Sequence, residues 1–163
     1  MDDSPVGNII LFLVLILFSA YFSGTEIALA SVNKIHMISK ASKGSHAAKR
    51  VLKILDNFDE ALSVLLIGNN IVNIACGTLA TAITLQFGAA WVTVATAVAT
   101  VVIFVLGEML PKSFALSCNE KFSEFASAFL MPLMFVLKPI SLVFSGLTVL
   151  VSLPFKKRTE VVE

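Results

Sequence analysis

The chain has 163 residues, of which 57% are hydrophobic and only 14% charged, and its mean hydropathy is +0.91. Soluble domains carry about 25% charged residues, so this composition excludes a soluble globular domain and predicts a protein embedded in the lipid bilayer. The formal net charge is +1. We expect no nucleic-acid partner.

The first predicted span covers residues 6–32, where Glu26 is the only formal charge. Asp2 and Asp3 precede it, whereas a secretory signal peptide begins with basic residues, so we expect a retained helix. The segment 33–55 then carries six lysine or arginine residues and no acid. By the positive-inside rule this basic loop is cytoplasmic, which predicts an extracellular N-terminus.

A run of 47 residues without a formal charge lies between Glu60 and Glu108. One helix needs about 20 residues to cross the hydrocarbon core, so the run predicts two spans, over about 61–85 and 90–108. The glutamine and glycine at 86–88 interrupt the apolar run and predict the turn between these spans. This turn is expected outside the cell.

The last part of the chain, 113–155, has charges and prolines too closely spaced for a comfortable further span. The basic cluster 156–158 predicts a cytoplasmic C-terminus, so we expect juxtamembrane or re-entrant short helices here. The alternative is a fourth full span over about 125–154, which would carry Lys138 into the membrane. The predicted fold is an all-α, multi-pass protein of the cell membrane, one transmembrane domain over 1–163 with three transmembrane helices and these short helices.

Polar side chains inside the first predicted span mark a functional region, because ionisable groups are costly in a bilayer. Ser23 and Glu26 lie one helical turn apart on one face, and Gly24 between them allows another backbone to approach closely. The structural alternative is a serine bonded to its own helix and a glutamate held by neighbouring helices.

Three asparagines gather in the second predicted span. Asn69 and Asn73 are four residues apart and share a helix face, while Asn70 shares a face with Asn73 at three residues. Such amides either join neighbouring helices by hydrogen bonds or offer their oxygens to a cation. Cys76 lies in the same span and is expected, like Cys118, to be a packing residue.

The third predicted span ends at Glu108, with Pro111 three residues later. Proline has no N–H to donate and its ring clashes with the carbonyl four residues earlier, so we expect the Gly107 oxygen to be freed. Lys112 is expected to pair with Glu108 and to reach toward the interface. The carboxylate, the carbonyl, the amides and the serine form an all-oxygen set that suits hard cations such as Mg²⁺ or Na⁺, and not Zn²⁺, copper or iron.

The motifs FSGTEIAL, GNNIVN and GEMLPK, in this order and with a basic loop after the first, resemble the membrane domain of the CorC and cyclin M (CNNM) family of magnesium transport proteins. The resemblance covers nearly the whole chain. It places Ser23 on the serine of the first motif, Asn69 and Asn73 on the asparagines of the second, and Glu108 and Pro111 on the acid and proline of the third.

The resemblance implies Mg²⁺ efflux, proposed in that family to be driven by Na⁺, a homodimer, and cytosolic CBS domains in the full-length protein that are absent from this chain. A membrane Mg²⁺ sensor or regulatory scaffold that does not itself transport is the alternative. An enzyme is not expected, because the chain contains neither HExxH nor GxSxG, and both histidines lie in the basic loop.

Overall fold

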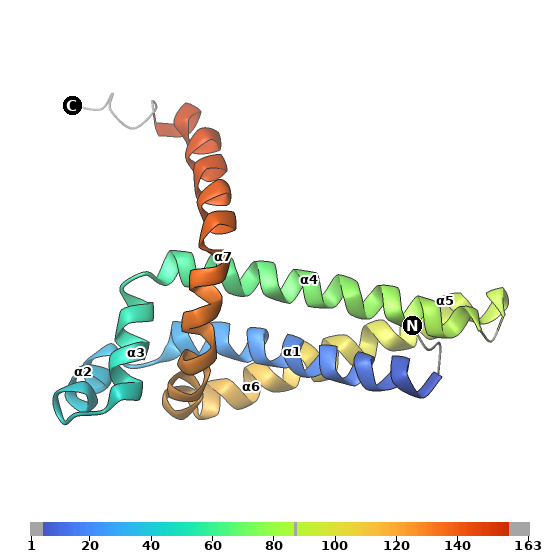
Figure 1. The fold of residues 1–163 in the computed structure, drawn as a ribbon, viewed down its shortest axis with the longest axis horizontal. Helices are drawn as coiled ribbons and strands as arrows, with labels where there is room; N and C mark the ends of the chain where they lie inside the picture. The colour runs from blue at the N-terminus through green and yellow to red at the C-terminus, as the bar shows by residue number, and fades with distance from the viewer. Residues whose placement is uncertain (1–4, 87, 157–163) are drawn as a thin grey trace.

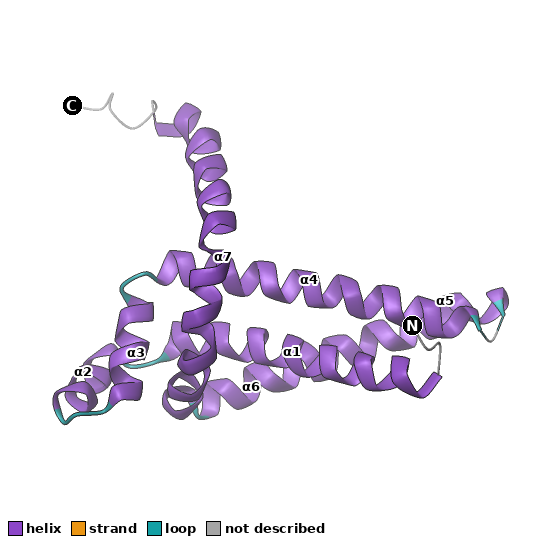
Figure 2. Ribbon diagram, viewed as in Figure 1, coloured by secondary structure: helices purple, strands orange, loops and turns teal. Residues whose placement is uncertain are grey.

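The structure is a computed structural model that describes residues 5–86 and 88–156, with side chains from 6 to 139 except at 87 and 89. Throughout those residues the chain is helical apart from short turns, with no β-strand among them (Figure 2). The predicted all-α class is therefore confirmed.

Three long helical rods lie side by side along the molecule (Figure 1). The first is α1 (Pro5–Ser31) and the second is α4 (Phe58–Leu85). The third is built from three consecutive pieces, α5 (Ala89–Val102), the π-helix η1 (Ile103–Met109) and α6 (Leu110–Ser117).

The outer faces of these rods are apolar, as a bilayer requires. Leu17 on α1, Ile74 on α4 and Val98 on α5 are 69%, 70% and 58% exposed. In water such surfaces would be a liability, but lipid tails solvate them at no cost. The buried residues concentrate toward the end of the bundle at which α3 lies, around Phe22 and Leu65.

The first two spans lie where the sequence predicts them, with candidate spans over Val6–Ser31 and Phe58–Leu85. The third extends further than expected, over Ala90–Ser117, because Pro111 does not end the helix. Proline is tolerated in the first turn of α6, and η1 provides the change of register just before it.

The basic segment between the first two rods is helical, where we expected a loop. It forms α2 (Lys34–Ser42) and α3 (His46–Leu55). The Asn33 side chain accepts hydrogen bonds from two amides of the first turn of α2, and Ser45 caps α3 through the Ala48 amide. The apolar face of α3 is buried at Ala48, Val51 and Ile54, whereas α2 buries only Met37 and leaves Ile35 exposed.

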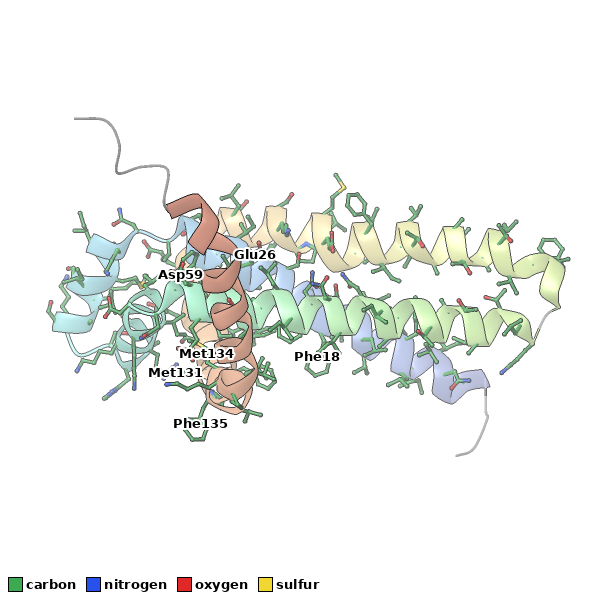
Figure 3. The ribbon with its side chains drawn as sticks, turned by 90° about the horizontal axis from the view of Figure 1, so that it is seen from above. Phe18, Glu26, Asp59, Met131, Met134 and Phe135 are labelled. Atoms are coloured by element: carbon green, nitrogen blue, oxygen red, sulfur yellow. The ribbon has the colours of Figure 1, made fainter. Side chains whose placement is uncertain are left out.

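The last helix, α7 (Asn119–Lys156), is one continuous element that runs through Pro132 and Pro139. The several short helices expected over 113–155 are therefore replaced by the end of α6 and one long helix. Figures 1 and 3, turned by 90° relative to each other, both show α7 crossing the three rods rather than lying parallel to them. Its part Asn119–Pro139 is the fourth helix long and apolar enough to cross a membrane.

Polar contacts fasten the start of α7 to the amphipathic α2. The Lys40 ammonium lies 2.9 Å from a Glu124 oxygen and 3.3 Å from Glu120, and His36 also contacts Glu120. The hydrogen bond to Glu124 raises the pKa of Lys40 above its ordinary value, so this lysine stays charged at neutral pH.

A second group of contacts fastens α7 to α1. The Tyr21 hydroxyl donates to the Ala126 carbonyl at 2.8 Å, and the Asn119 amide donates to the Ser31 carbonyl at 3.0 Å. Phe122 presses its ring against Gly24, where an added Cβ would lie only 2.7 Å from the ring. These contacts fix α7 against the end of α1 that faces α2 and α3.

Candidate functional site

The Ser19 hydroxyl is the meeting point of the three rods. It lies 2.9 Å from Asn73 Oδ1, 3.1 Å from Asn69 Oδ1 and 3.4 Å from the Gly107 carbonyl oxygen. Ser19 belongs to α1, the asparagines to α4 and Gly107 to η1, and Ser19 is fully buried. We call these four residues together with Glu108 the Ser19 cluster.

One hydroxyl proton has to serve three acceptor oxygens in the Ser19 cluster. A serine donates a single hydrogen bond, so it cannot satisfy both amide oxygens and the carbonyl at once. The Asn73 amide nitrogen is already engaged, because it donates to a Glu108 carboxylate oxygen at 3.1 Å. The cluster thus presents more oxygen lone pairs than hydrogens, which is the electrostatic character of a cation site.

Glu108 supplies the negative charge of the Ser19 cluster. Its carboxylate is half-buried and held by Asn73. A carboxylate among neutral oxygens offsets part of the cost of stripping water from a cation. Of the six residues predicted as metal ligands, the four that lie together here are Asn69, Asn73, Gly107 and Glu108.

A π-helix brings the backbone of Gly107 to the Ser19 cluster. η1 spans seven residues, and the amide of Leu110 bonds to the carbonyl of Val105, five residues back. Pro111 stands four residues after Gly107 and has no N–H to offer its carbonyl. The Gly107 oxygen instead contacts Ser19, and π-turns of this kind recur at functional sites.

Gly107 is required by space as well as by hydrogen bonding. A Cβ built on this buried residue would lie 2.8 Å from Ser19 Oγ and 3.2 Å from Ser19 Cβ. Real Cβ contacts essentially never fall below 3.0 Å. The absence of a side chain therefore lets η1 and α1 approach closely enough to share oxygens.

Several predicted site residues lie outside the Ser19 cluster. Ser23 is fully buried one turn further along α1, and its hydroxyl has no hydrogen-bond partner among the described residues. Asn70 is exposed on the surface of α4. Gly24 packs against the Phe122 ring rather than against another backbone.

Lys112 takes a different partner from the expected one. Its ammonium lies 3.5 Å from a Glu26 oxygen, and no Lys112 pair with Glu108 is formed. Each of the two side chains is instead engaged with a neighbouring rod, Lys112 with α1 and Glu108 with α4. Glu108 accepts a hydrogen bond from Asn73, and Lys112 pairs with Glu26 on α1.

Ser19 is not among the residues that we predicted for the site, although the sequence contains a signal for it. Ser19 and Ser23 are four residues apart and therefore share one face of α1. We expected Ser23 to join the asparagines in the oxygen set, whereas the structure places Ser19 beside Asn69. Four residues correspond to about 6 Å along a helix, an offset that depends on how the helices pack.

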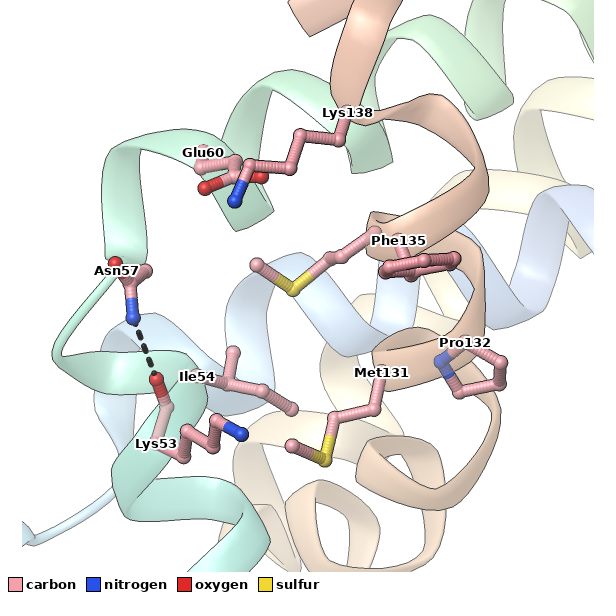
Figure 4. Close-up of a pocket in the computed structure, with 9 residues that line it drawn as sticks. Lys53, Ile54, Asn57, Glu60, Met131, Pro132, Phe135 and Lys138 are labelled. Atoms are coloured by element: carbon pink, nitrogen blue, oxygen red, sulfur yellow. Dashed lines mark hydrogen bonds between the residues drawn. The ribbon is translucent and has the colours of Figure 1, made fainter.

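A separate hollow of about 420 Å³ opens where α3, α4 and α7 meet (Figure 4). Lys53 and Lys138 line it from two sides, and Figure 4 shows the Lys138 side chain extended toward Glu60. The rest of the lining is mostly apolar and includes Met131 and Phe135. With two ammonium groups and one carboxylate, this hollow suits a cation poorly compared with the Ser19 cluster.

Comparison with known proteins gives a consistent result. The family model described as cyclin M transmembrane N-terminal domain (CNNM) matches residues 10–162. A UPF0053 protein of Haemophilus influenzae is 38% identical over 142 residues, which cover 86% of this chain and 34% of that protein. The UPF0053 inner membrane protein YfjD of Escherichia coli is 38% identical over 131 residues, which cover 80% of this chain and 31% of YfjD. The chain thus spans about a third of the length of these relatives.

Proposed function

The chain belongs to the family of the cyclin M transmembrane N-terminal domain, and from this premise we propose that it is the membrane-embedded part of a magnesium exporter. The Ser19 cluster binds the transported Mg²⁺. The observation that supports this most is the convergence of three neutral oxygens on one buried hydroxyl, with the carboxylate of Glu108 at their edge.

The chemistry of the donors favours a hard divalent cation. Amide, carbonyl, hydroxyl and carboxylate oxygens are the ligands of Mg²⁺ and Ca²⁺, whereas Zn²⁺ and copper prefer imidazole and thiolate. His36 and His46 lie in α2 and α3, away from the rods that form the cluster. Mg²⁺ gives up its water reluctantly and usually keeps some, which fits a site with one carboxylate.

Transport requires the Ser19 cluster to open alternately to the two sides of the membrane. We place α1, α4 and the α5–η1–α6 rod across the bilayer, and α7 along its cytoplasmic surface, because α7 crosses the rods. The basic α2 and α3 then lie in the cytoplasm and the N-terminus outside. Small shifts of η1 against α1 expose the cluster to one side or the other, and the entry of Na⁺ supplies the driving force.

The oligomer is proposed to be a homodimer. The family resemblance supports a dimer, and so does the small size of the chain, which has only three rods with which to enclose an ion path. Cytosolic CBS domains are the further partner that the family resemblance implies. Cross-linking in lipid tests the dimer, and a purely monomeric product would refute it.

A membrane sensor or regulatory scaffold for Mg²⁺ is the second candidate, because the same cluster would serve binding without movement. Purified protein in liposomes that contain a Mg²⁺-sensitive dye separates the two functions. A transporter moves Mg²⁺ unaided, and the Glu108→Gln variant does not. If the parent protein binds Mg²⁺ but the dye signal matches that of protein-free liposomes, the chain is a sensor.

A further inference from the structure

An ion pair lies about two helical turns beyond Ser19 along α1. Glu26 on α1 and Lys112 on α6 approach to 3.5 Å, with side chains 28% and 39% exposed. Glu26 lies beyond Ser19 in the direction of α2, and Lys112 lies beyond Glu108 toward the same end of the molecule. Figure 3 shows Glu26 on the α3 side of Phe18 along α1.

Ser23 fills the interval between the ion pair and the Ser19 cluster. It follows Ser19 by four residues and precedes Glu26 by three, so all three side chains share one face of α1. The Ser23 hydroxyl is fully buried and has no partner among the described residues. A buried hydroxyl without a partner is costly, so the Ser23 oxygen is available to a ligand or to the water that the ligand carries.

The side-chain oxygens of Ser19, Ser23 and Glu26 therefore follow one another along one face of α1. Glu26 is the outermost of them and the only one with a charge, so it is the first attractive group for a cation that arrives from the α2–α3 end. In this structure its charge is already taken by the ammonium of Lys112. A divalent cation bound at Glu26 would be repelled by the Lys112 ammonium, which lies 3.5 Å from that carboxylate.

We infer that Lys112 is a tethered cation that occupies Glu26 when the Ser19 cluster is empty, and that a divalent cation must displace it. Occupation of the cluster and the Glu26–Lys112 pair then exclude each other. This inference rests on the proposed function, because it assigns a second carboxylate and a specificity-determining lysine to the same cation path.

The pair also discriminates between cations by charge. At equal distance a divalent ion is attracted to Glu26 with twice the Coulomb energy of the lysine ammonium, whereas a monovalent ion gains no advantage over it. We expect Mg²⁺, whose dehydration cost the oxygens of the Ser19 cluster offset, to displace Lys112, and Na⁺ at equal ionic strength to leave the pair in place. Lys112 thus selects divalent over monovalent cations at Glu26, before they reach the Ser19 cluster.

Acylation of lysines by an amine-reactive ester, read by mass spectrometry, tests the inference without any transport assay. We expect Mg²⁺ to increase the labelling of Lys112 at the same concentrations at which calorimetry shows binding, and Na⁺ of equal ionic strength to leave it unchanged. Lys34 is the internal control, because its exposed pair with Asp56 at 3.0 Å lies at the start of α2. Its labelling should not respond to Mg²⁺.

Two variants supply an independent measurement. Lys112→Gln removes the competitor and should tighten Mg²⁺ binding by about two- to fivefold, the range expected for a partly exposed ion pair. Glu26→Gln leaves the ammonium beside the path and should weaken binding. Lys34→Gln removes the same charge elsewhere and should change nothing.

The outcomes separate this inference from the proposed function. If the parent binds Mg²⁺ while Lys112 labelling stays constant and Lys112→Gln keeps the parent affinity, the pair is only structural and the inference is overturned. If the parent shows no Mg²⁺ binding by calorimetry, the proposed function fails and the inference fails with it.

Discussion

Gly107 is the position where one added methyl group should disturb the Ser19 cluster most. In Gly107→Ala the new Cβ would lie 2.8 Å from Ser19 Oγ, so η1 and α1 have to separate or Ser19 has to change rotamer. Overpacking of this kind costs about 1–3 kcal/mol. The gain in helix propensity on replacing glycine is about 1 kcal/mol at most, so the variant should be less stable than the parent.

The effect on Mg²⁺ binding should exceed the effect on folding. Any separation of η1 from α1 lengthens the 3.4 Å contact between the Gly107 oxygen and Ser19 and moves Glu108, the adjacent residue. We expect Mg²⁺ affinity to fall by about tenfold or more, which corresponds to about 1.4 kcal/mol. Isothermal titration measures the affinity, and thermal unfolding in detergent measures the stability.

Gly77→Ala is the matched control. Gly77 lies in α4, and a Cβ added there meets nothing within 4 Å. This variant should keep the parent affinity and equal or slightly exceed its stability. Parent-like Mg²⁺ affinity in Gly107→Ala would show that the close approach of η1 and α1 is unnecessary and would refute the site geometry.

Three further predictions concern the site and the topology. Glu108→Gln should fold but lose Mg²⁺ binding in calorimetry, because the amide keeps an acceptor for Asn73 and removes the charge. Glu108→Asp should lose less affinity. Parent-like binding by the glutamine variant would show that another acid supplies the charge of the site. Ser19→Ala should weaken Mg²⁺ binding in the same titration, whereas Asn70→Ala, which alters an exposed side chain, should not. The reverse result would show that the site lies elsewhere along α4. A cysteine replacing Ser45 should react with an impermeant thiol reagent only from the cytoplasm and one replacing Gln86 only from outside; the opposite pattern would invert the topology.

Local spacing was sufficient to predict much of the site. The four-residue interval between Asn69 and Asn73 fixes a shared helix face, and both amides do contact Ser19. The position of Pro111 identified Gly107 as a carbonyl without its usual partner, and that carbonyl does meet another helix. These inferences needed only the geometry of a single helix.

Features that depend on how helices pack could not be read from spacing. The offset between α1 and α4 decides whether Ser19 or Ser23 meets the asparagines, and no pattern within one helix encodes it. Lys112 pairs with Glu26 on α1 rather than with Glu108, and this choice depends on how close α6 lies to α1. Proline spacing likewise predicted breaks in the last segment, yet α7 continues through Pro132 and Pro139 and packs against α1, α3 and α4.

The position of a bound divalent ion is the most direct test of the Ser19 cluster. Mn²⁺ resembles Mg²⁺ in its preference for oxygen ligands and gives an anomalous X-ray signal, so crystals grown with Mn²⁺ would locate it. A single peak within about 2.0–2.3 Å of oxygens of Ser19 and Glu108 is expected. A peak beside Glu26 with none at Ser19, or no peak between α1, α4 and η1, would contradict the assignment of this cluster as the cation site.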